Sequence, residues 1–462
     1  MQDLTTGSVS KHLLTTASFM LVTMVFQTLY FLVDLYWVGS LGKEAVAGVG
    51  VAGNLTFIVL AVSQMLGVGT TTLVSHAAGQ KNAARALLVF NQSQVLSMVA
   101  GGLFLLISMI ARVPYAEQLS GDPQTAALAS SYLLWFLPAM GLQFGIVAMG
   151  AALRGIGNFK PGMVVQTSTV IINIILAPIL IFGWGTGIAL GVTGAAIATL
   201  VAVIVGVLWL ATYFVSAGAY LRFVKRDLKP QLNLWWDMLK IGLPAGAEFG
   251  MMAVYLMVVY VIAKPFGSAA QAGFSIGMRV VQSLFMPIVA LGFAVAPVAG
   301  QNFGARRGDR VKDVFKTACL MGGTAMLLMA ILCNIAGAEL VRLFSKDPDV
   351  IAVGDEYLRI VSWNFVASGL IFVSSSMFQA MGNTIPSLIA SFCRILLIAI
   401  PALILSKTPD FALNWIWYLS VAAVIVQLGI VLSFLRREFR RRLDTMAAAP
   451  LTPVAAAPDL AL

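Results

Sequence analysis

Twelve apolar stretches, each long enough to cross a bilayer, constrain this 462-residue chain more than any other feature. A spanning helix needs about 20 predominantly apolar residues. Because 60% of the residues are hydrophobic and only 10% are charged, against about 25% in soluble domains, the composition argues against a water-soluble enzyme and against disorder. We predict spanning helices at about 13–38, 48–73, 86–111, 127–151, 162–182, 189–217, 238–262, 274–299, 314–338, 356–381, 386–406 and 414–435.

The positions of the basic residues predict the topology. With a cytoplasmic N-terminus, 20 of the 29 Lys and Arg residues fall in inner loops, the adjoining span ends or the tail, seven fall in outer loops or at outer span ends, and Arg279 and Arg394 fall in the interior of spans. Cytoplasmic loops of membrane proteins carry such an excess of positive charge. We therefore expect both termini in the cytoplasm and the chain in a bacterial inner membrane. The net charge of +10 then reflects topology, and no nucleic-acid partner is expected.

The two halves of the chain repeat at a constant offset of 225 residues. Gly79 matches Gly304, and Asp122 matches Asp347. Six spans, an even number, separate the copies, so both have one orientation and are related by a pseudo-two-fold axis along the membrane normal. We predict an all-α monomer with a cytoplasmic N-terminus (1–12), an N-terminal six-helix lobe (13–217), a basic linker (218–234), a C-terminal six-helix lobe (235–442) and a disordered cytoplasmic tail (443–462).

Only two acidic residues, Asp34 and Glu248, lie in the interior of the predicted spans, because Glu356 falls at the outer end of its span. Asp34 follows Thr23, Gln27 and Tyr30 at spacings that place all four on one helical face. Such a polar face is expected to line a water-filled cavity or a bundle interior. Asp34 either functions in transport or hydrogen-bonds a neighbouring helix, but an uncharged Asn or Ser would serve the second role at lower desolvation cost. A carboxylate that holds either a proton or a cation is the minimum chemistry of an antiporter.

Glu248 lies four residues after Pro244, in the cytoplasmic half of the seventh predicted helix. It shares a face with Tyr255, and the proline permits local bending. Two interpretations remain open. Glu248 is either a second functional carboxylate or a structural partner for a cation such as Lys240 or for a loop amide.

Other polar side chains within the spans are candidates for contact with a small amphipathic substrate, although helix–helix hydrogen bonding explains them as easily. The cysteines and histidines have no metal-binding spacing, and GIGNFKP lacks the spacing of a nucleotide-binding loop. We therefore expect no enzyme, metal or organic cofactor. The candidates for the substrate cavity are Gln27, Tyr30, Gln64, Gln166, Tyr255, Arg279, Gln282 and Asn364.

Several segments, taken together, resemble the multidrug and toxic compound extrusion (MATE) family. They are LTTGSVSKHLL, QTLYFLVDLYWVGSLG, RGIGNFKP, NIILAPILIFG, GVTGAAIAT, GLPAG and QAMGNTIP, and the resemblance covers essentially residues 4–442. It implies two six-helix bundles arranged as a V, and export of amphipathic, often cationic, compounds in exchange for protons or sodium. It also implies cation coupling through Asp34, with Asn173 and Thr199 at matching positions of the fifth and sixth helices.

Three departures from the family pattern bear on the coupling ion. Ala177 stands where members with the fullest N-lobe site carry Asp, Phe19 stands in place of a first-helix proline, and the stretch near Leu370 has no acid. Glu248 also lies about one turn before the usual glutamate. Since a proton needs only one base, we expect proton coupling through Asp34, with sodium coupling as the alternative.

A different class of function is a flippase for a lipid-linked precursor within the same superfamily. Such a protein needs a strongly cationic cavity for phosphates, and only Arg279 and Arg394 lie within the predicted spans. A membrane-embedded enzyme is disfavoured because no acid or histidine constellation is present.

Overall fold

The computed structural model describes residues 2–185, 187–216, 219–406, 408 and 411–447, and the regular elements in these ranges are helices. The N-terminal lobe contains α1 (Val9–Gly39), α2 (Lys43–Gly53), α3 (Leu55–Gly79), α4 (Ala83–Leu119), α5 (Pro123–Gly155), α6 (Lys160–Phe182) and α7 (Gly191–Val215). After η1 (Lys225–Leu228), the C-terminal lobe contains α8 (Leu232–Ala263), η2 (Lys264–Phe266), α9 (Ser268–Gly304), α10 (Gly308–Arg342), α11 (Pro348–Val361), η3 (Ser362–Asn364), α12 (Phe365–Ala380), α13 (Ile385–Leu405) and α14 (Asn414–Ala447).

The predicted number of spanning helices is confirmed. Within the described residues, twelve segments are helical, long and apolar enough to cross a membrane. The second span consists of α2 and α3, which break at Asn54, and the tenth consists of α11, η3 and α12. The protein is therefore a multi-pass membrane protein surrounded by lipid.

The internal repeat is visible in how corresponding helices begin. The carboxylate of Asp122 accepts the amide of Thr125 at 2.8 Å, and that of Asp347 accepts the amide of Asp349 at 2.9 Å. Each aspartate is followed by a proline in the first helical turn, where the missing amide hydrogen costs nothing. The hydroxyl and the amide of Thr125 hold the pKa of Asp122 below its ordinary value.

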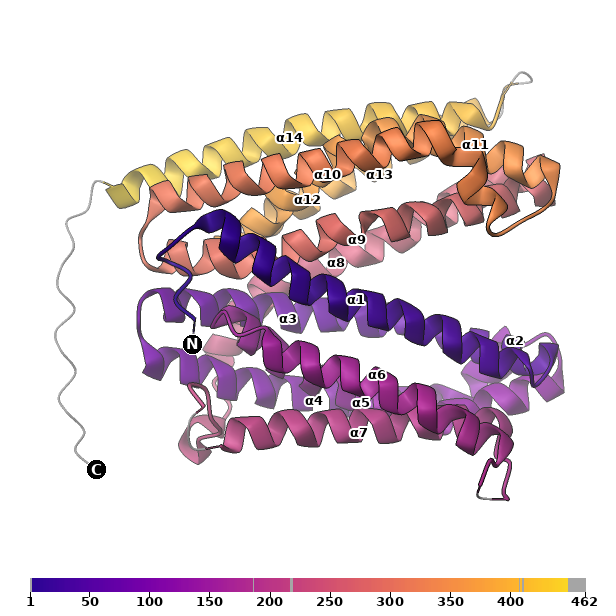
Figure 1. Ribbon diagram of the computed structural model, residues 1–462, viewed down its shortest axis with the longest axis horizontal. Helices are drawn as coiled ribbons and strands as arrows, with labels where there is room; N and C mark the ends of the chain where they lie inside the picture. Colours follow the sequence, from indigo (N-terminus) through magenta and orange to yellow (C-terminus); the bar gives the residue numbers. More distant parts are fainter. Residues whose placement is uncertain (1, 186, 217–218, 407, 409–410, 448–462) are drawn as a thin grey trace.

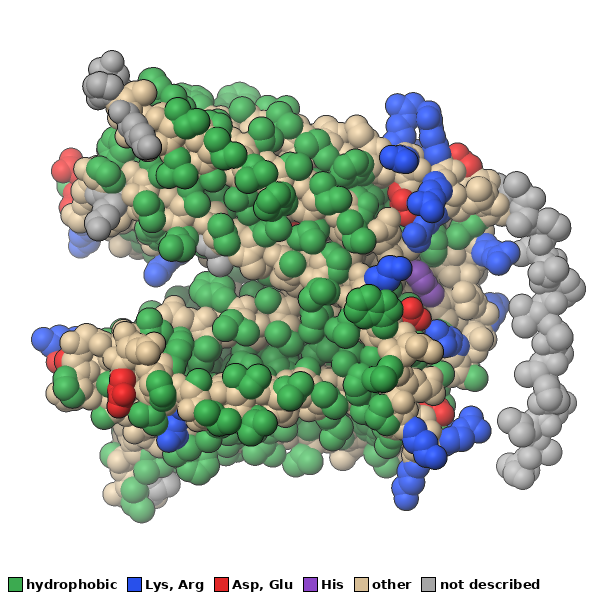
Figure 2. All heavy atoms as spheres, turned by 180° about the vertical axis from the view of Figure 1, so that it is seen from behind, with side chains coloured by type: hydrophobic (Ala, Val, Ile, Leu, Met, Phe, Trp, Pro, Cys, Tyr) green, Lys and Arg blue, Asp and Glu red, His purple; other side chains and the backbone are tan. Residues whose placement is uncertain are grey.

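The lobes approach each other at one end and separate at the other (Figure 1). We call the end where α1 begins and α14 finishes the closed end, and the end with α2 and α11 the open end. The first spanning helix of each lobe packs on the second spanning segment of the other lobe. Helix α1 contacts α9, and α8 contacts α3. From behind, the space-filling view shows a cleft between the lobes that leads in from the open end (Figure 2).

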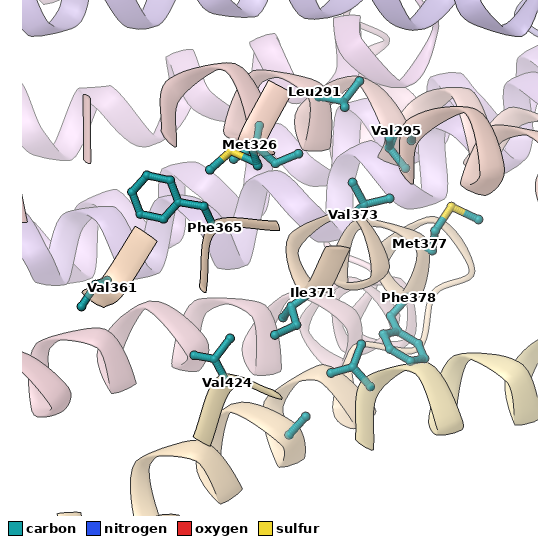
Figure 3. Packing of buried hydrophobic residues seen from close by; sticks show 14 of the residues in the cluster. Leu291, Val295, Met326, Val361, Phe365, Ile371, Val373, Met377, Phe378 and Val424 are labelled. Carbon is teal, nitrogen blue, oxygen red and sulfur yellow. The ribbon is translucent and has the colours of Figure 1, made fainter. Parts of the chain in front are cut away.

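Each lobe has its own packed core. In the C-terminal lobe, Phe365 and Met377 of α12 lie among Leu291 of α9, Met326 of α10 and Val424 of α14 (Figure 3). Separate groups of buried side chains fill the N-terminal lobe. Close packing inside each lobe lets it keep its shape when the contacts between the lobes change.

The predicted tail boundary at residue 443 is too early. Helix α14 continues to Ala447, because Leu443 is 2% exposed and packs against the start of α10 at Gly308. The rest of the predicted tail, residues 448–462, lies outside the described residues.

Candidate functional site

Asp34 lies on α1, in the half toward the open end, and is partly buried. Its Oδ1 atom is buried and has no hydrogen-bond partner among the described residues. A buried carboxylate oxygen without a donor is costly in its charged form. Among the described residues, no cationic side chain forms an ion pair with this carboxylate.

One turn away, three predicted site residues from three helices meet. The Tyr30 hydroxyl on α1 lies 3.2 Å from Thr199 Oγ1 on α7, and the Asn173 amide on α6 donates to the same oxygen at 3.1 Å. The Thr199 hydroxyl donates in turn to the carbonyl of Ala195 at 3.2 Å. A hydroxyl oxygen accepts two hydrogen bonds, so Tyr30 and Asn173 together occupy both positions on Thr199.

Sequence reasoning missed Tyr132 of α5 as a neighbour of Asp34. Tyr132 is 3% exposed, and its phenol lies within electrostatic range of the Asp34 carboxylate. It belongs to the same buried apolar group as Ala177, which is 1% exposed. The position of this tyrosine inside a predicted span was the available signal.

Glu248 of α8, in contrast, is surrounded by hydroxyl donors. Ser391 Oγ lies 2.8 Å and Ser387 Oγ 3.1 Å from its carboxylate, and Ser375 Oγ lies 3.4 Å away. The Gln427 amide on α14 donates to Ser391 at 3.3 Å. These hydroxyls from α12 and α13, and not Lys240, are the donors to Glu248 in the described chain. Ser387 and Ser391 stand four residues apart in the sequence, a signal that was present but not used.

Tyr255 lies on α8 with Glu248, and Arg394 lies on α13 with Ser387 and Ser391. The Arg394 guanidinium lies 5.5 Å from the centre of the Tyr255 ring, within range of a cation–π interaction. Arg394 is also within electrostatic range of the Glu248 carboxylate, and its Nε is buried without a hydrogen-bond partner among the described residues.

The other predicted cavity residues do not join either cluster. Gln27, Arg279 and Gln282 are exposed, whereas Gln64 and Gln166 are partly buried. Asn364 is 4% exposed, and its Oδ1 has no partner among the described residues. None of these side chains hydrogen-bonds Asp34 or Glu248 in the described chain, and their assignment to a substrate cavity stays a prediction.

A partly buried cation, Arg154, was not predicted as a site residue. It lies beyond the predicted span 127–151 but within the last turn of α5, where a positive charge is favoured by the helix dipole. With Thr23 and Gln166 it lines a cavity of about 20 Å³, room for about one water molecule. Its guanidinium lies 5.9 Å from the ring centre of Phe293 on α9, in the other lobe.

Comparison with known proteins places the chain in a family. The MatE family model matches residues 20–179 and 244–405, which is more than half of the chain and covers both lobes. The multidrug export protein MepA of Staphylococcus aureus is 27% identical over 434 residues, covering 92% of this chain and 93% of the relative. The probable multidrug resistance protein YoeA of Bacillus subtilis is 26% identical over 428 residues and covers 92% of each.

Solved structures share the fold. An outward-facing multidrug resistance MATE family transporter matches with a TM-score of 0.88 at 24% identity, covering 95% of this chain and 98% of that one. A MATE structure in a bent conformation matches with a TM-score of 0.90 at 24% identity, covering 96% and 98%. A transporter from Pyrococcus furiosus, described as having a binding pocket of reverse polarity, matches with a TM-score of 0.87 at 24% identity, covering 95% and 97%.

Proposed function

Because this chain belongs to the MatE family of transporters, we propose that it exports small amphipathic, cationic compounds from the bacterial cytoplasm in exchange for protons. The observation that carries the proposal is the buried Asp34 Oδ1 without a hydrogen-bond donor in the described chain. In the absence of a donor, this group is stabilised either by a proton or by a cation. Mutually exclusive binding of the two is the basis of antiport.

The proposed orientation puts the closed end in the cytoplasm. Both the start of α1 and the finish of α14 lie there (Figure 1). Exposed arginines gather at the same end, on the turn before α10 and on the last turns of α14. The positive-inside rule places such residues on the cytoplasmic side. The cleft at the open end then faces outward.

The transport cycle follows from this orientation. A proton enters from the outside through the cleft and neutralises Asp34, so the cationic substrate loses its counter-charge and leaves. The lobes then move so that the cleft opens inward, where the proton dissociates and another substrate binds. Because each lobe keeps its own core, the motion is assigned to the contacts between the lobes.

The hydrogen bonds beside Asp34 favour a proton over sodium. A sodium ion needs several oxygen ligands at once, and Thr199 Oγ1 is the natural second ligand. Its two acceptor positions are taken by Tyr30 and Asn173. Sodium binding would break at least one of these bonds, whereas protonation of Asp34 breaks none.

One observation favours the second candidate function, a flippase for a lipid-linked precursor. Arg154 and Arg394 are largely buried, and neither forms an ion pair in the described chain. Unpaired guanidinium groups bind phosphates well. A lipid-scrambling assay beside a dye-export assay distinguishes the two functions.

The experiment that tests the first proposal is dye export from proteoliposomes under separately imposed proton and sodium gradients. Wild-type protein is expected to respond to the proton gradient, and Asp34→Asn is expected to abolish the response. Asp349→Asn makes the same chemical change at an exposed position at the start of α11 and serves as the matched control. Proton-driven export by folded Asp34→Asn protein would show that the assignment is wrong.

A further inference from the structure

A short N-terminal segment, residues 2–7, crosses the closed end and hydrogen-bonds to both lobes. The amide of Gln2 donates to the carbonyl of Ile156, just after α5, at 3.0 Å. Two residues later, the amide of Leu4 donates to the side-chain oxygen of Gln301, on α9, at 3.0 Å. The first of these partners belongs to the N-terminal lobe and the second to the C-terminal lobe.

The C-terminal lobe holds the segment with further bonds, all to backbone carbonyls. These side chains bind the backbone of the segment. Asn302 Nδ2 donates to the carbonyl of Leu4 at 3.1 Å, and Arg307 Nη1 donates to the carbonyl of Thr5 at 2.7 Å. Arg310 Nη2 donates to the carbonyl of Gly7 at 3.1 Å.

Burial and local turns fix the conformation of the segment. Leu4 is 0% exposed and belongs to the apolar core of the C-terminal lobe, and Thr5 is 5% exposed. The Asp3 carboxylate accepts both the amide and the hydroxyl of Thr5, at 2.9 and 2.5 Å. A ring nitrogen of His12 lies 2.6 Å from the carbonyl of Thr6. A segment that is polar in sequence is thus folded into a defined shape.

Beneath the segment, the lobes are joined by two side chains at equivalent positions of the repeat. His76 Nε2 lies 2.6 Å from the carbonyl of Ala380, and Gln301 Nε2 donates to the carbonyl of Gly155 at 2.9 Å. His76 and Gln301 are 225 residues apart, as are Gly155 and Ala380. The side-chain oxygen of Gln301 also accepts a hydrogen bond from the amide of Leu4. Gln301 therefore joins the N-terminal segment to the contact between the lobes.

We propose that the two lobes together form a docking site for a chain segment at the closed end, and that residues 2–7 occupy it as a detachable strap. The strap leads directly into α1, which packs on α6 of its own lobe and on α9 of the C-terminal lobe. When the closed end opens and α1 moves with α6 away from α9, Leu4 is pulled out of the core of the other lobe and the bonds to Gln301 and Asn302 break. The strap thereby favours the state that is closed at this end. This inference rests on alternating access but not on the identity of the coupling ion.

The test measures the distance between the lobes at the closed end. Spin labels are placed at Ala84→Cys and Asp309→Cys, two exposed and equivalent positions at the starts of α4 and α10, after replacement of Cys319, Cys333 and Cys393. Leu4→Asp undocks the strap, whereas Thr6→Asp adds the same charge to an exposed position of the same segment. Pulsed electron resonance in nanodiscs gives the distance distribution for each.

Burial of the Leu4 side chain stabilises only the closed state, and its loss corresponds to about a tenfold to hundredfold increase in the ratio of open to closed protein. We therefore expect a new population at longer distance in Leu4→Asp and a wild-type distribution in Thr6→Asp. A wild-type distribution in Leu4→Asp, or an equal change in both variants, would overturn the proposal.

A second measurement covers the case in which Leu4→Asp fails to fold. A specific protease site inserted between the exposed residues Gly7 and Ser8 releases the strap from purified, folded protein. Cleavage is expected to produce the same longer distance, and an unchanged distribution after complete cleavage would contradict the strap. The outcome is independent of Asp34, because the Asp34→Asn protein carries the same strap and is expected to show the same response to cleavage.

Discussion

Gly246 of α8 provides a sharp test of how the lobes pack. A Cβ atom added there would lie 2.7 Å from the carbonyl oxygen of Ala61 on α3 and 3.2 Å from the Cβ of Met65. An ordinary contact begins at 3.4 Å, so α8 and α3 would have to separate by roughly 0.7 Å at this point. Overpacking of this kind costs about 1–3 kcal/mol. The cost falls on the contact between the lobes and not on either core.

Gly250, one turn further along the same helix, is the matched control. It is exposed, and a Cβ added there has nothing within 4 Å. Alanine is favoured over glycine in a helix by up to about 1 kcal/mol, so Gly250→Ala is expected to be neutral or slightly stabilising. The two substitutions are chemically identical and differ in whether α3 lies opposite.

The assay combines thermal unfolding with the distance measurement between Ala84→Cys and Asp309→Cys. Gly246→Ala is expected to shift the ratio of open to closed protein by about tenfold and to lower the melting temperature, whereas Gly250→Ala does neither. If Gly246→Ala gave the melting temperature and distances of the wild type, the close approach of α3 and α8 would not be what holds the lobes together.

Three further predictions address individual groups. Glu248→Gln is expected to fold and to transport more slowly, measured as export per folded molecule; lost expression with normal specific transport would indicate a structural role. Thr199→Val removes the acceptor shared by Tyr30 and Asn173 and is expected to lower export, whereas Thr199→Ser is expected to restore it. The Thr5 hydroxyl lowers the pKa of Asp3 below 3.8, so this carboxylate contributes to strap docking above pH 3.8 and the contribution is lost as the pH falls through the lowered pKa. Asp3→Asn, which removes this charge, is therefore expected to give a longer closed-end distance than the wild type at pH 7, and identical distance distributions for the two proteins at that pH would contradict this account of Asp3.

The fold was largely predictable because its main determinants are local. Spanning helices need only a length of apolar sequence, and the repeat keeps its offset because equivalent turns use the same residues, as Asp122 and Asp347 do. The shared face of Asp34 and Tyr30 followed from helical spacing. The family resemblance placed Asn173 and Thr199 at matching positions of two helices, and the direct hydrogen bond between them is visible only in the structure.

The strap and the serine donors of Glu248 were not predicted because they depend on contacts without a sequence pattern. Leu4 meets Gln301 through a backbone amide, and backbone recognition leaves no residue preference to detect. Ser387 and Ser391 were visible as a pair, but their partner lies on a helix far away in the sequence. Arg154 fell outside the predicted span 127–151 because α5 continues four residues beyond it, to Gly155.

The central claim is that one carboxylate, Asp34, holds a proton and a cationic substrate in turn. It is tested most directly by adding a cationic substrate to purified protein in weakly buffered, sodium-free solution and measuring proton release. We predict release of about one proton for each substrate bound by the wild type at a pH where Asp34 is protonated, and none in Asp34→Asn. Substrate binding without proton release by the wild type, or equal release by Asp34→Asn, would contradict the account.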